Sequence, residues 1–525
     1  MYLTIPQLLA GAAERDPGGI WLRSDDLPAG LTFEGAVTQV ARTAGRLAQA
    51  GVRKGDLVVV TARSTPRYLL VWLALVSLGA ISVPTNPESA PAELAGLLGQ
   101  GRPRALVSDA GLAEVVAEAG AAALAELGVL DVGELTPAWD RPAASEALPD
   151  AGVTPDDLAV LLPTSGTTGR SKLVMQPHRT YSMAGEGFPY WMELTAADRM
   201  MTSLPLFHIN ALAYSVMGSL ACGAGLVLLP RFSARDFLAA ARRHGATEFN
   251  AIGAMLEILM RQPESSHDAD TALRLCYTGP APTQQRQEEI EARFGLRIVV
   301  GYAMSETTYG LIWPRGTRPY GTLGTVRQHP REGVVNQARI ARADGSEVGV
   351  DEVGQLLLRN PAVTPGYWNM PDETARAIVD GWLHTGDLVT RGEDGMVTFV
   401  GREKEVIRRR GENLSPLEVE EVLTAHPAVV ECAVVGVPSD LSEEEVKAFV
   451  VAVAGTAPDF VELHAWVAER LAAFKVPRYW QALTELPHTP TGRVAKHRLP
   501  IGHHEGEHDS AGVVAPAPAA GEDHP

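Results

Sequence analysis

The sequence predicts an α/β fold in which a large N-terminal domain is built from two helix-covered sheets. Short apolar runs such as DLVVVTA and LRIVVGY alternate with helical stretches such as QQRQEEIEARFG, an alternation typical of parallel sheets covered by helices. Between residues 320 and 400, approximately, the sequence changes to short strands separated by turns, which indicates a small antiparallel β subdomain. A chain of 525 residues also exceeds what one hydrophobic core usually supports, so we expect more than one domain.

The most apolar stretch, YLLVWLALVSLGAISVP, begins at Tyr68 and has the composition of a membrane span. Its apolar run of about seventeen residues is at the short limit for crossing a bilayer. The SLGA in its middle favours a buried helix that ends near Gly79 and is followed by a short strand. We therefore expect no integral membrane segment. The N-terminal residues also lack the basic-then-apolar order of a secretory signal.

Helix and strand patterns return after the segment GREKEVIRRRGENLSP, in PLEVEEVLTAH, VVECAVVGVP and KAFVVAVA. They predict a small α+β domain over residues 403–501, after an N-terminal domain over residues 1–402. The boundary is expected between Arg402 and Lys404.

The last residues, 502–525, are rich in Gly, Ala, Pro and charge, so they are predicted to form a disordered tail. Solvation is a more frequent state of such tail histidines than metal binding. This expectation applies to His503, His504 and His508.

The charge balance excludes some classes of partner. The chain has 45 Lys and Arg against 63 Asp and Glu, a formal net charge of −18, which disfavours nonspecific binding to nucleic acid or anionic membranes. Any polyanion must therefore be held by a local site. The three cysteines, Cys222, Cys276 and Cys432, are too few and too scattered for a disulfide framework or a zinc site, which fits a reducing, cytoplasmic location.

A loop rich in glycine and hydroxyls, PTSGTTGRSK, follows the apolar run LAVLL. Such a loop can wrap backbone N–H groups around phosphate oxygens, because glycine reaches the required dihedral angles. The Walker pattern does not fit, since only two residues separate Gly166 from Gly169, and Arg170 and Ser171 precede Lys172. By itself the segment is therefore either a different phosphate loop or a flexible surface turn.

Four further segments lie downstream in a fixed order: GYAMSET, WLHTGD, GREKEVI and PTGRVAK. Together with TSGTTGRSK, they resemble the adenylate-forming superfamily of acyl-CoA synthetases, luciferases and peptide-synthetase adenylation domains, from Leu3 to about Leu499. The segments PLFHIN and RRRGEN are similar to those of carnitine/crotonobetaine-type CoA ligases. The resemblance implies that a carboxylate attacks the α-phosphorus of ATP, pyrophosphate leaves, and a thiol captures the acyl-adenylate. It implies ATP, Mg²⁺ and coenzyme A as cofactors.

The resemblance also implies roles for individual residues. Tyr302 would stack on adenine, Glu306 would hold Mg²⁺, and Asp387 would accept from the ribose hydroxyls with Arg402 beside it. An ordinary core tyrosine and a turn-capping aspartate are the competing interpretations of Tyr302 and Asp387. The implied catalytic residues are Lys496, Ser305, Glu306 and His208. The implied nucleotide-binding residues are Thr164, Ser165, Gly166, Thr167, Thr168, Gly169, Lys172, Gly279, Pro280, Ala281, Tyr302, Ser305, Asp387 and Arg402.

Three positions depart from the family pattern. Ser171 stands where proline is frequent, Ala303 stands where glycine is common, and Ser305 replaces the usual threonine. The serine hydroxyl can still donate to a phosphate oxygen.

His208 stands at the entrance of the acyl pocket of the family, with a buried core histidine as the alternative. Ile209 replaces the aspartate that pairs with the ammonium of α-amino acids, so an amino-acid substrate is disfavoured. We expect a medium-sized apolar or aromatic acid with limited polar decoration. The predicted pocket residues are His208, Ile209, Asn210, Thr278, Gly279, Val300, Gly301 and Met304, with Tyr214, Ala254 and Met255 as further candidates.

The C-terminal domain is expected to be mobile, as in the family. Lys496 would bridge the substrate carboxylate and the α-phosphate in the first half-reaction. Rotation about a hinge at Lys404 would then bring Gly411 and Glu412 to line the pantetheine path.

Three functions remain open from the sequence. The first is a carboxylate–CoA ligase whose partners are the acid and CoA. The second keeps adenylation but transfers to a separate carrier protein, an amine or nitrite. The third is a noncatalytic nucleotide-binding protein, which the coherent set of polar residues disfavours. A homodimer is a further expectation.

Overall fold

In the computed structural model, the chain divides into two compact units. The first unit holds Met1–Arg339, Leu357–His384 and Gly392–Thr398, and the second holds Ile340–Leu356, Thr385–Arg391 and Phe399–Pro525. The β subdomain expected at 320–400 is thus shared between the units. The structure describes residues 2–120, 126, 128–136, 146–164, 172–279, 281–331, 333, 335–409, 412–438, 444–489, 494–501 and 506–510.

A six-stranded sheet in the first unit has the order β6-β5-β3-β4-β7-β8. Its strands pair in parallel from β6 to β7, and β7 pairs antiparallel with β8. Every residue of β3 and β4 is buried, as in a sheet with both faces covered. The elements are β3 (Leu57–Thr61), α3 (Pro66–Ser77), β4 (Ile81–Thr85), α4 (Pro91–Gly101), β5 (Ala105–Ser108), α5 (Ala113–Glu118), β6 (Val129–Asp131), α7 (Val132–Leu135), β7 (Leu158–Thr164) and β8 (Lys172–Pro177).

The apolar stretch after Tyr68 forms the helix α3, a turn and the strand β4, which confirms the prediction. Thr65 caps the helix, because its side chain accepts from the backbone N–H of Tyr68. The turn needs glycine at Gly79, whose φ is +72°. All residues of α3 except Arg67 are buried, so its apolar character serves the protein core.

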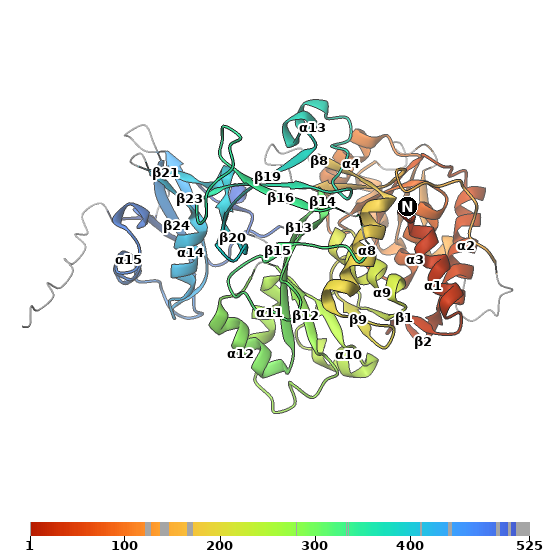
Figure 1. Cartoon of the computed structure of the whole chain (residues 1–525), viewed down its shortest axis with the longest axis horizontal. Coiled ribbons are helices and arrows are strands. Elements are labelled where there is room, and N and C mark those ends of the chain that lie inside the picture. Colours follow the sequence, from red (N-terminus) through yellow and green to blue (C-terminus); the bar gives the residue numbers. More distant parts are fainter. Residues whose placement is uncertain are drawn as a thin grey trace, which may run out of the picture. The chain divides into compact units, whose positions relative to one another are not determined.

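A nine-stranded sheet in the same unit has the order β15-β14-β13-β12-β11-β9-β10-β1-β2 (Figure 1). The strands from β13 to β1 pair in parallel, whereas β14, β15 and β2 are antiparallel additions at the edges. The strands are β1 (Ile20–Ser24), β2 (Leu27–Thr32), β9 (Arg199–Thr202), β10 (Gly225–Leu228), β11 (Glu248–Asn250), β12 (Leu275–Thr278), β13 (Arg297–Met304), β14 (Thr307–Ile312) and β15 (Thr325–Val326).

The chain reverses its direction of strand addition between β9 and β11. From β9 it continues to β10 on one side, and from β11 to β12 and β13 on the other. In open parallel sheets, ligands bind beyond the carboxyl ends of the strands at such a reversal. The fold therefore points to the loops after β9 and β11 as part of a ligand site.

One buried apolar cluster contains residues from both sheets. The helices α1, α2, α3, α8 and α9 contact one another and contribute to this cluster (Figure 1). Its largest buried side chains include Trp21, Trp72, Tyr181 and Phe188. The remaining helical elements of the unit are α1 (Ile5–Arg15), α2 (Phe33–Gln49), α8 (His178–Met192), the π-helix η2 (Ala211–Val216), α9 (Met217–Cys222), α10 (Phe237–His244), α11 (Gly253–Met260), α12 (Gln284–Phe294) and α13 (Pro371–Ala377).

A five-stranded sheet has the order β16-β17-β19-β18, with β20 also paired to β19. The division between the units passes through strands of this sheet, which lies in the region expected to hold short strands. Its strands are β16 (Gln337–Ala341), β17 (Gly354–Arg359), β18 (Ile378–Val379), β19 (Trp382–Arg391) and β20 (Val397–Arg402).

The rest of the second unit is a small α+β fold. It contains the hairpin β21-β22 and a four-stranded sheet of order β23-β24-β25-β26, with apolar clusters on its two faces. The elements are η3 (Glu403–Glu405), β21 (Ile407–Arg409), β22 (Glu412–Leu414), α14 (Pro416–Thr424), β23 (Val429–Pro438), β24 (Glu444–Ala452), α15 (Phe460–Ala468), η4 (Ala473–Lys475), β25 (Tyr479–Ala482), η5 (Lys496–Arg498) and β26 (His508–Asp509).

The short strand β26 corrects the sequence analysis, which assigned all of 502–525 to a disordered tail. His508 and Asp509 pair antiparallel with β25. The buried ammonium of Lys447 forms an ion pair with Glu507, and Arg478 binds both carboxylate oxygens of Asp509 at 3.0 and 3.1 Å. The composition of residues 502–525 is typical of a disordered tail. It contains no information about the edge of the sheet, where β25 offers hydrogen-bond partners to His508 and Asp509.

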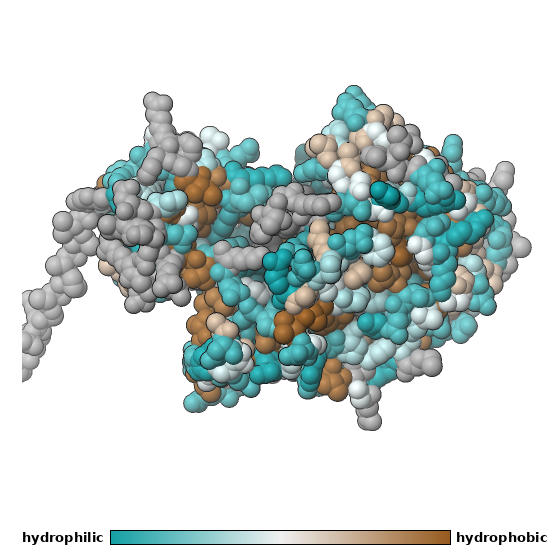
Figure 2. Space-filling model, turned by 90° about the horizontal axis from the view of Figure 1, so that it is seen from above, coloured by the Kyte–Doolittle hydropathy of each residue, from teal (hydrophilic) through white to brown (hydrophobic). Residues whose placement is uncertain are grey.

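Within the described part of the chain, no helix combines the length and the apolar character needed to cross a bilayer. Figure 2 shows hydrophilic and apolar residues interspersed over the face that it presents. Exposed apolar side chains of this kind are normal in folded proteins.

Replacing Glu507 with Gln should destabilise the C-terminal sheet, because the buried ammonium of Lys447 would lose its ion pair with Glu507. Breaking one side of a buried ion pair costs about 3 kcal/mol. Hydrogen exchange of the β24 and β25 amides would measure the loss. Glu469→Gln is the matched control, since Glu469 is 63% exposed in its pair with Arg470 and should change stability by less than about 0.5 kcal/mol. Equal protection in both variants would contradict the prediction.

Candidate active site

The glycine-rich loop connects two antiparallel strands. Thr164, the last residue of β7, pairs with Lys172, the first of β8, and its hydroxyl donates to the Lys172 carbonyl at 3.3 Å. The loop itself, residues 165–171, lies outside the described residues, and so do the predicted ligands Ser165, Gly166, Thr167, Thr168 and Gly169. The structure therefore fixes both ends of the loop, and its phosphate-binding role stays a prediction.

The Lys172 side chain lies among residues of a distant segment. Its ammonium forms an ion pair with Glu373 of α13 and lies 4.8 Å from the centre of the Tyr367 ring. About a fifth of the side chain is exposed. A partly buried ammonium held by a carboxylate and an aromatic face is well placed to exchange its partner for an anionic ligand.

Tyr367 connects Lys172 to Glu306. The hydroxyl of Tyr367 donates to Glu306 Oε1 at 2.8 Å, while its ring lies against Lys172. Burial, with the Glu306 charge in addition, holds the pKa of Tyr367 well above its usual value, so the hydroxyl stays protonated and remains a donor. Two predicted site residues from different parts of the chain are thus joined through one side chain.

Sequence reasoning missed Tyr367 and Glu373. The glycine of PGYW is a sequence signal for a fixed turn directly before Tyr367. Gly366 has φ +139°, and a Cβ there would lie 2.4 Å from Thr374 Cγ2, so the position requires glycine. The turn holds the segment along β8, where the N–H of Trp368 donates to the Leu173 carbonyl at 2.8 Å. Nothing in the local sequence signals the contact of Glu373 with Lys172.

Tyr302 and Ser305 lie at the carboxyl end of β13. The Tyr302 side chain is half-buried, and its hydroxyl lies 3.8 Å from Met304 Sδ. The Ser305 carbonyl accepts from Gln176 Nε2 at 2.8 Å, and Gln176 in turn accepts from Tyr181 at 2.7 Å. Gln176, which the sequence analysis did not single out, thereby positions the turn that carries Ser305 and Glu306.

The predicted acyl-pocket residues gather at the carboxyl ends of β9, β12 and β13. His208, Ile209 and Asn210 are half-buried in the loop after β9, and the His208 ring lies 4.4 Å from the Phe207 ring, centre to centre. Thr278 ends β12, Met304 ends β13, and Val300 lies within β13. Thr278 and Val300 are buried, Met304 and Ala281 are half-buried, Tyr214 and Met255 are buried, and Pro280 lies outside the described residues.

Two predicted pocket positions require glycine. A Cβ on Gly279 would lie 2.6 Å from the Gly301 carbonyl oxygen, and a Cβ on Gly301 would lie 2.8 Å from the Tyr277 hydroxyl. The close approach of β12 and β13 leaves no room for either atom. These glycines therefore shape the end of the sheet.

In the second unit, Asp387 and Arg402 face each other from β19 and β20. Arg402 Nε lies 3.0 Å from Asp387 Oδ1, with Asp387 1% exposed and Arg402 45% exposed. The Asp387 backbone N–H donates to Thr385 Oγ1 at 3.1 Å. The predicted neighbours are adjacent, and their nucleotide-binding role stays a prediction.

Lys496 is held by two carboxylates within the second unit. Its Nζ lies 2.7 Å from Glu420 Oε1 and 3.6 Å from Glu405 Oε2. Glu420 also accepts from the Val434 backbone N–H at 2.7 Å, which fixes the carboxylate. Of the other predicted residues of this unit, Lys404 lies in η3, Glu412 begins β22, and Gly411 lies outside the described residues.

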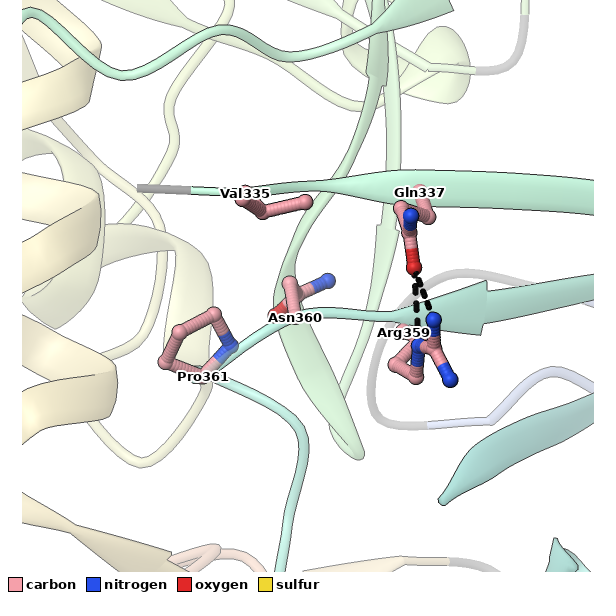
Figure 3. A pocket seen from close by; sticks show the side chains of 5 residues that line it. All are labelled: Val335, Gln337, Arg359, Asn360 and Pro361. Carbon is pink, nitrogen blue, oxygen red and sulfur yellow. Dashed lines mark hydrogen bonds between the residues drawn. The ribbon is translucent and has the colours of Figure 1, made fainter. Parts of the chain in front are cut away.

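Two open hollows lie in the first unit. The one in Figure 3, of about 360 Å³, is lined by Val335, Gln337, Arg359, Asn360 and Pro361, with Gln337 Oε1 accepting twice from Arg359. None of these residues was predicted in the site. The other, of about 510 Å³, includes Tyr367 and Thr374 in its lining and so borders the Lys172 cluster.

Comparison with known proteins identifies the family. The AMP-binding enzyme family matches residues 9–368, and the AMP-binding enzyme C-terminal domain matches residues 418–493. The chain belongs to the AMP-binding enzymes. This confirms the adenylate-forming superfamily that the ordered motifs predicted, together with its α/β fold of a large and a small domain.

Relatives and solved structures of the family match over most of the chain. A crotonobetaine/carnitine–CoA ligase of Salmonella arizonae is 32% identical over 480 residues, covering 88% of this chain and 91% of that relative. The crystal structure of ATP-bound MatB from Rhodopseudomonas palustris superposes with a TM-score of 0.83 at 27% identity, covering 94% and 98% of the two chains. The AMP complex of O-succinylbenzoate coenzyme A synthetase from Bacillus subtilis superposes with a TM-score of 0.84 at 26% identity, covering 96% and 100%.

Replacing Tyr367 with Phe should weaken binding of ATP with Mg²⁺ about tenfold, because the hydrogen bond that fixes Glu306 is lost while the ring under Lys172 remains. Titration calorimetry measures the affinity. Tyr190→Phe is the control, since it removes a hydroxyl that contacts only the exposed Arg315 among the described residues. Unchanged affinity in Tyr367→Phe would show that Glu306 needs no such support.

Proposed function

We infer that this chain is an ATP-dependent acid–thiol ligase that activates a carboxylic acid as its acyl-adenylate and passes the acyl group to coenzyme A. The observation that carries this inference is the cluster of Lys172, Tyr367 and Glu306. This cluster lies beside β7 and β8, the two strands that the glycine-rich loop connects. The family match and relatives named as CoA ligases, aligned over 88% of the chain, support it. They favour CoA over a carrier-protein thiol, an amine or nitrite as the acceptor.

The reaction needs positioning and charge neutralisation more than a protein nucleophile. The substrate carboxylate attacks the α-phosphorus, and the bond to the β-phosphate oxygen breaks to release pyrophosphate. Lys172 and the backbone of the glycine-rich loop are proposed to bind the β- and γ-phosphates. Tyr302 would stack on adenine, and Asp387, held by Arg402, would accept from the ribose hydroxyls.

Glu306 fits the proposed Mg²⁺. No cluster of three metal-ligating side chains occurs among the described residues, yet Mg²⁺ commonly binds one or two carboxylates together with the phosphates of a nucleotide. The ion would neutralise charge on the triphosphate. Tyr367 keeps the Glu306 carboxylate oriented for this role.

Lys496 is proposed to act at the α-phosphate in the first half-reaction. In the structure its ammonium is paired with Glu420 and Glu405, so it must leave these carboxylates to contact substrate. Rotation about Lys404 would then expose the Gly411 and Glu412 segment to the pantetheine arm for the second half-reaction, in which the CoA sulfur attacks the acyl carbon and AMP leaves. A cytoplasmic location and a homodimer also belong to this proposal.

ATP–pyrophosphate exchange over a panel of carboxylic acids, followed by addition of CoA, tests the function. We expect acyl and aryl acids to drive exchange well above the α-amino acids, since Ile209 provides no charge for an ammonium. Thioester should form only with CoA present. Exchange with no acid of the panel, or an adenylate that CoA does not consume, would contradict the proposal.

The two half-reactions should be separable by mutation. Lys496→Ala should lower adenylate formation by about two orders of magnitude, because a charge at the reacting phosphate is lost, while conversion of a supplied acyl-adenylate to thioester persists. Lys404→Pro should do the reverse, since proline restricts the hinge dihedral angle. Single-turnover kinetics of each half-reaction measures both effects. Equal damage to both half-reactions in both variants would contradict the alternation of the domain.

A further inference from the structure

The loops after β9 and β11 meet at the reversal of the nine-stranded sheet. Asn250 is the last residue of β11, and Asn210 lies at the end of the loop after β9. Asn250 Nδ2 donates to Asn210 Oδ1 at 2.7 Å and to Ser215 Oγ at 3.2 Å. The π-helix η2 carries Ser215, and such helices are frequent at functional sites. Two amides and a hydroxyl therefore converge where the topology places a ligand.

One buried acceptor in this cluster, Asn250 Oδ1, accepts no hydrogen bond within the described part of the chain. Asn250 is 1% exposed, both amide hydrogens are used, and Oδ1 contacts no donor among the residues that the structure describes. A buried polar atom without a partner is costly, so such an atom at a ligand site points to a group of the ligand. The half-buried Asn210 beside it marks the open side of the cluster.

A buried positive charge lies next to the same cluster. The Arg327 side chain is fully buried, and its guanidinium donates to the Tyr214 hydroxyl at 2.8 Å, to the Thr308 carbonyl at 2.9 Å and to the Tyr277 hydroxyl. Among the described residues, no carboxylate forms an ion pair with it. Its field therefore acts with little compensation in a low-dielectric interior.

The guanidinium and the Asn250 cluster share neighbours. Tyr277 is the strand partner of Asn250, and Tyr214 directly precedes Ser215. A Cβ on Gly301 would lie 3.0 Å from Arg327 Nη2, so the charge lies directly behind this predicted pocket residue. The predicted pocket region therefore combines an acceptor that has no hydrogen-bond partner among the described residues with a positive charge.

We propose that Asn250 is a specificity-determining residue and that the acid activated by this enzyme carries a hydroxyl group on an otherwise uncharged acyl or aryl chain. This proposal rests on the proposed function, whose acid it specifies. The hydroxyl hydrogen donates to Asn250 Oδ1. A hydroxyl also fits if the amide is turned over, because its oxygen then accepts from Nδ2.

The buried guanidinium disfavours a cationic group on the acid. An ammonium at the inner end of the pocket would lie near Arg327 without a described counter-charge, and like charges at low dielectric repel strongly. Carnitine and crotonobetaine, named for the Salmonella relative, carry such a quaternary ammonium. This chain therefore differs from that relative in the class of acid that it accepts.

Two matched series of acids test the proposal on the wild-type enzyme by pyrophosphate exchange. One is benzoate with its 3-hydroxy, 4-hydroxy and 4-trimethylammonio derivatives, and the other is hexanoate with its 6-hydroxy and 6-trimethylammonio derivatives. In at least one series we expect kcat/KM for a hydroxy acid to exceed that of its parent about ten- to hundredfold, and the ammonium acid to fall below the parent.

Substitutions at Asn250 test whether this residue is the origin of the preference for the hydroxy acid over its parent acid. In Asn250→Leu, which keeps the approximate shape, the ratio of hydroxy acid to parent should fall to about one. In Asn250→Asp, the added carboxylate should raise the ammonium acid relative to the parent. Asn86→Leu is the control, because it removes a half-buried amide elsewhere in the first unit and should keep the wild-type ratio.

The outcomes separate this proposal from the proposed function. Exchange with the parent acids but no gain from any hydroxyl would overturn the specificity and leave the ligase activity standing. A wild-type ratio in folded Asn250→Leu would overturn the role of Asn250, and preference for the ammonium acids in the wild type would overturn the role of Arg327. Absence of exchange with every acid would instead contradict the ligase function itself.

Discussion

The parallel pairing of β9 with β11 is the constraint on which the candidate site depends. These strands are distant in the sequence, yet Glu248 and Phe249 pair with Met200 and Met201 at the middle of the nine-stranded sheet. Because the chain leaves the pair in opposite directions, the carboxyl edge of this pair is where open parallel sheets bind ligands. The half-buried His208 loop and the buried Asn250 amide both lie at this edge.

The polar groups of the first unit are held by partners that come from other segments. Tyr367 holds Glu306 through its hydroxyl and Lys172 through its ring, while Gln176 holds the turn at Ser305. Each contact restricts a side chain that would otherwise sample several rotamers, and this preorganisation lowers the cost of binding a charged ligand. The site thus depends on residues that would not themselves touch the reacting atoms.

Several charged side chains of the second unit form ion pairs with one another. Lys496 is paired with Glu420 and Glu405, Asp387 with Arg402, and Lys447 with Glu507. These pairs differ in burial, and so in the cost of breaking them: Lys447 is almost fully buried, whereas about a fifth of Lys496 is exposed. A partly exposed pair costs little to open, which suits a lysine that is proposed to change partners during the reaction, whereas the buried pair suits a structural role.

The sequence by itself determined the family, the α/β class and the positions of most elements. These follow from local order: apolar runs give the strands, the glycine after α3 ends a helix, and motif spacing identifies the AMP-binding enzymes. It could not determine that Tyr367 joins Lys172 to Glu306, that His508 and Asp509 complete a sheet, or that Asn250 lies beside Asn210. Those contacts join residues that are distant from each other in the chain. Only the tertiary structure decided them, because a hydrogen bond or a ring contact depends on distance in space and leaves no periodic trace in the sequence.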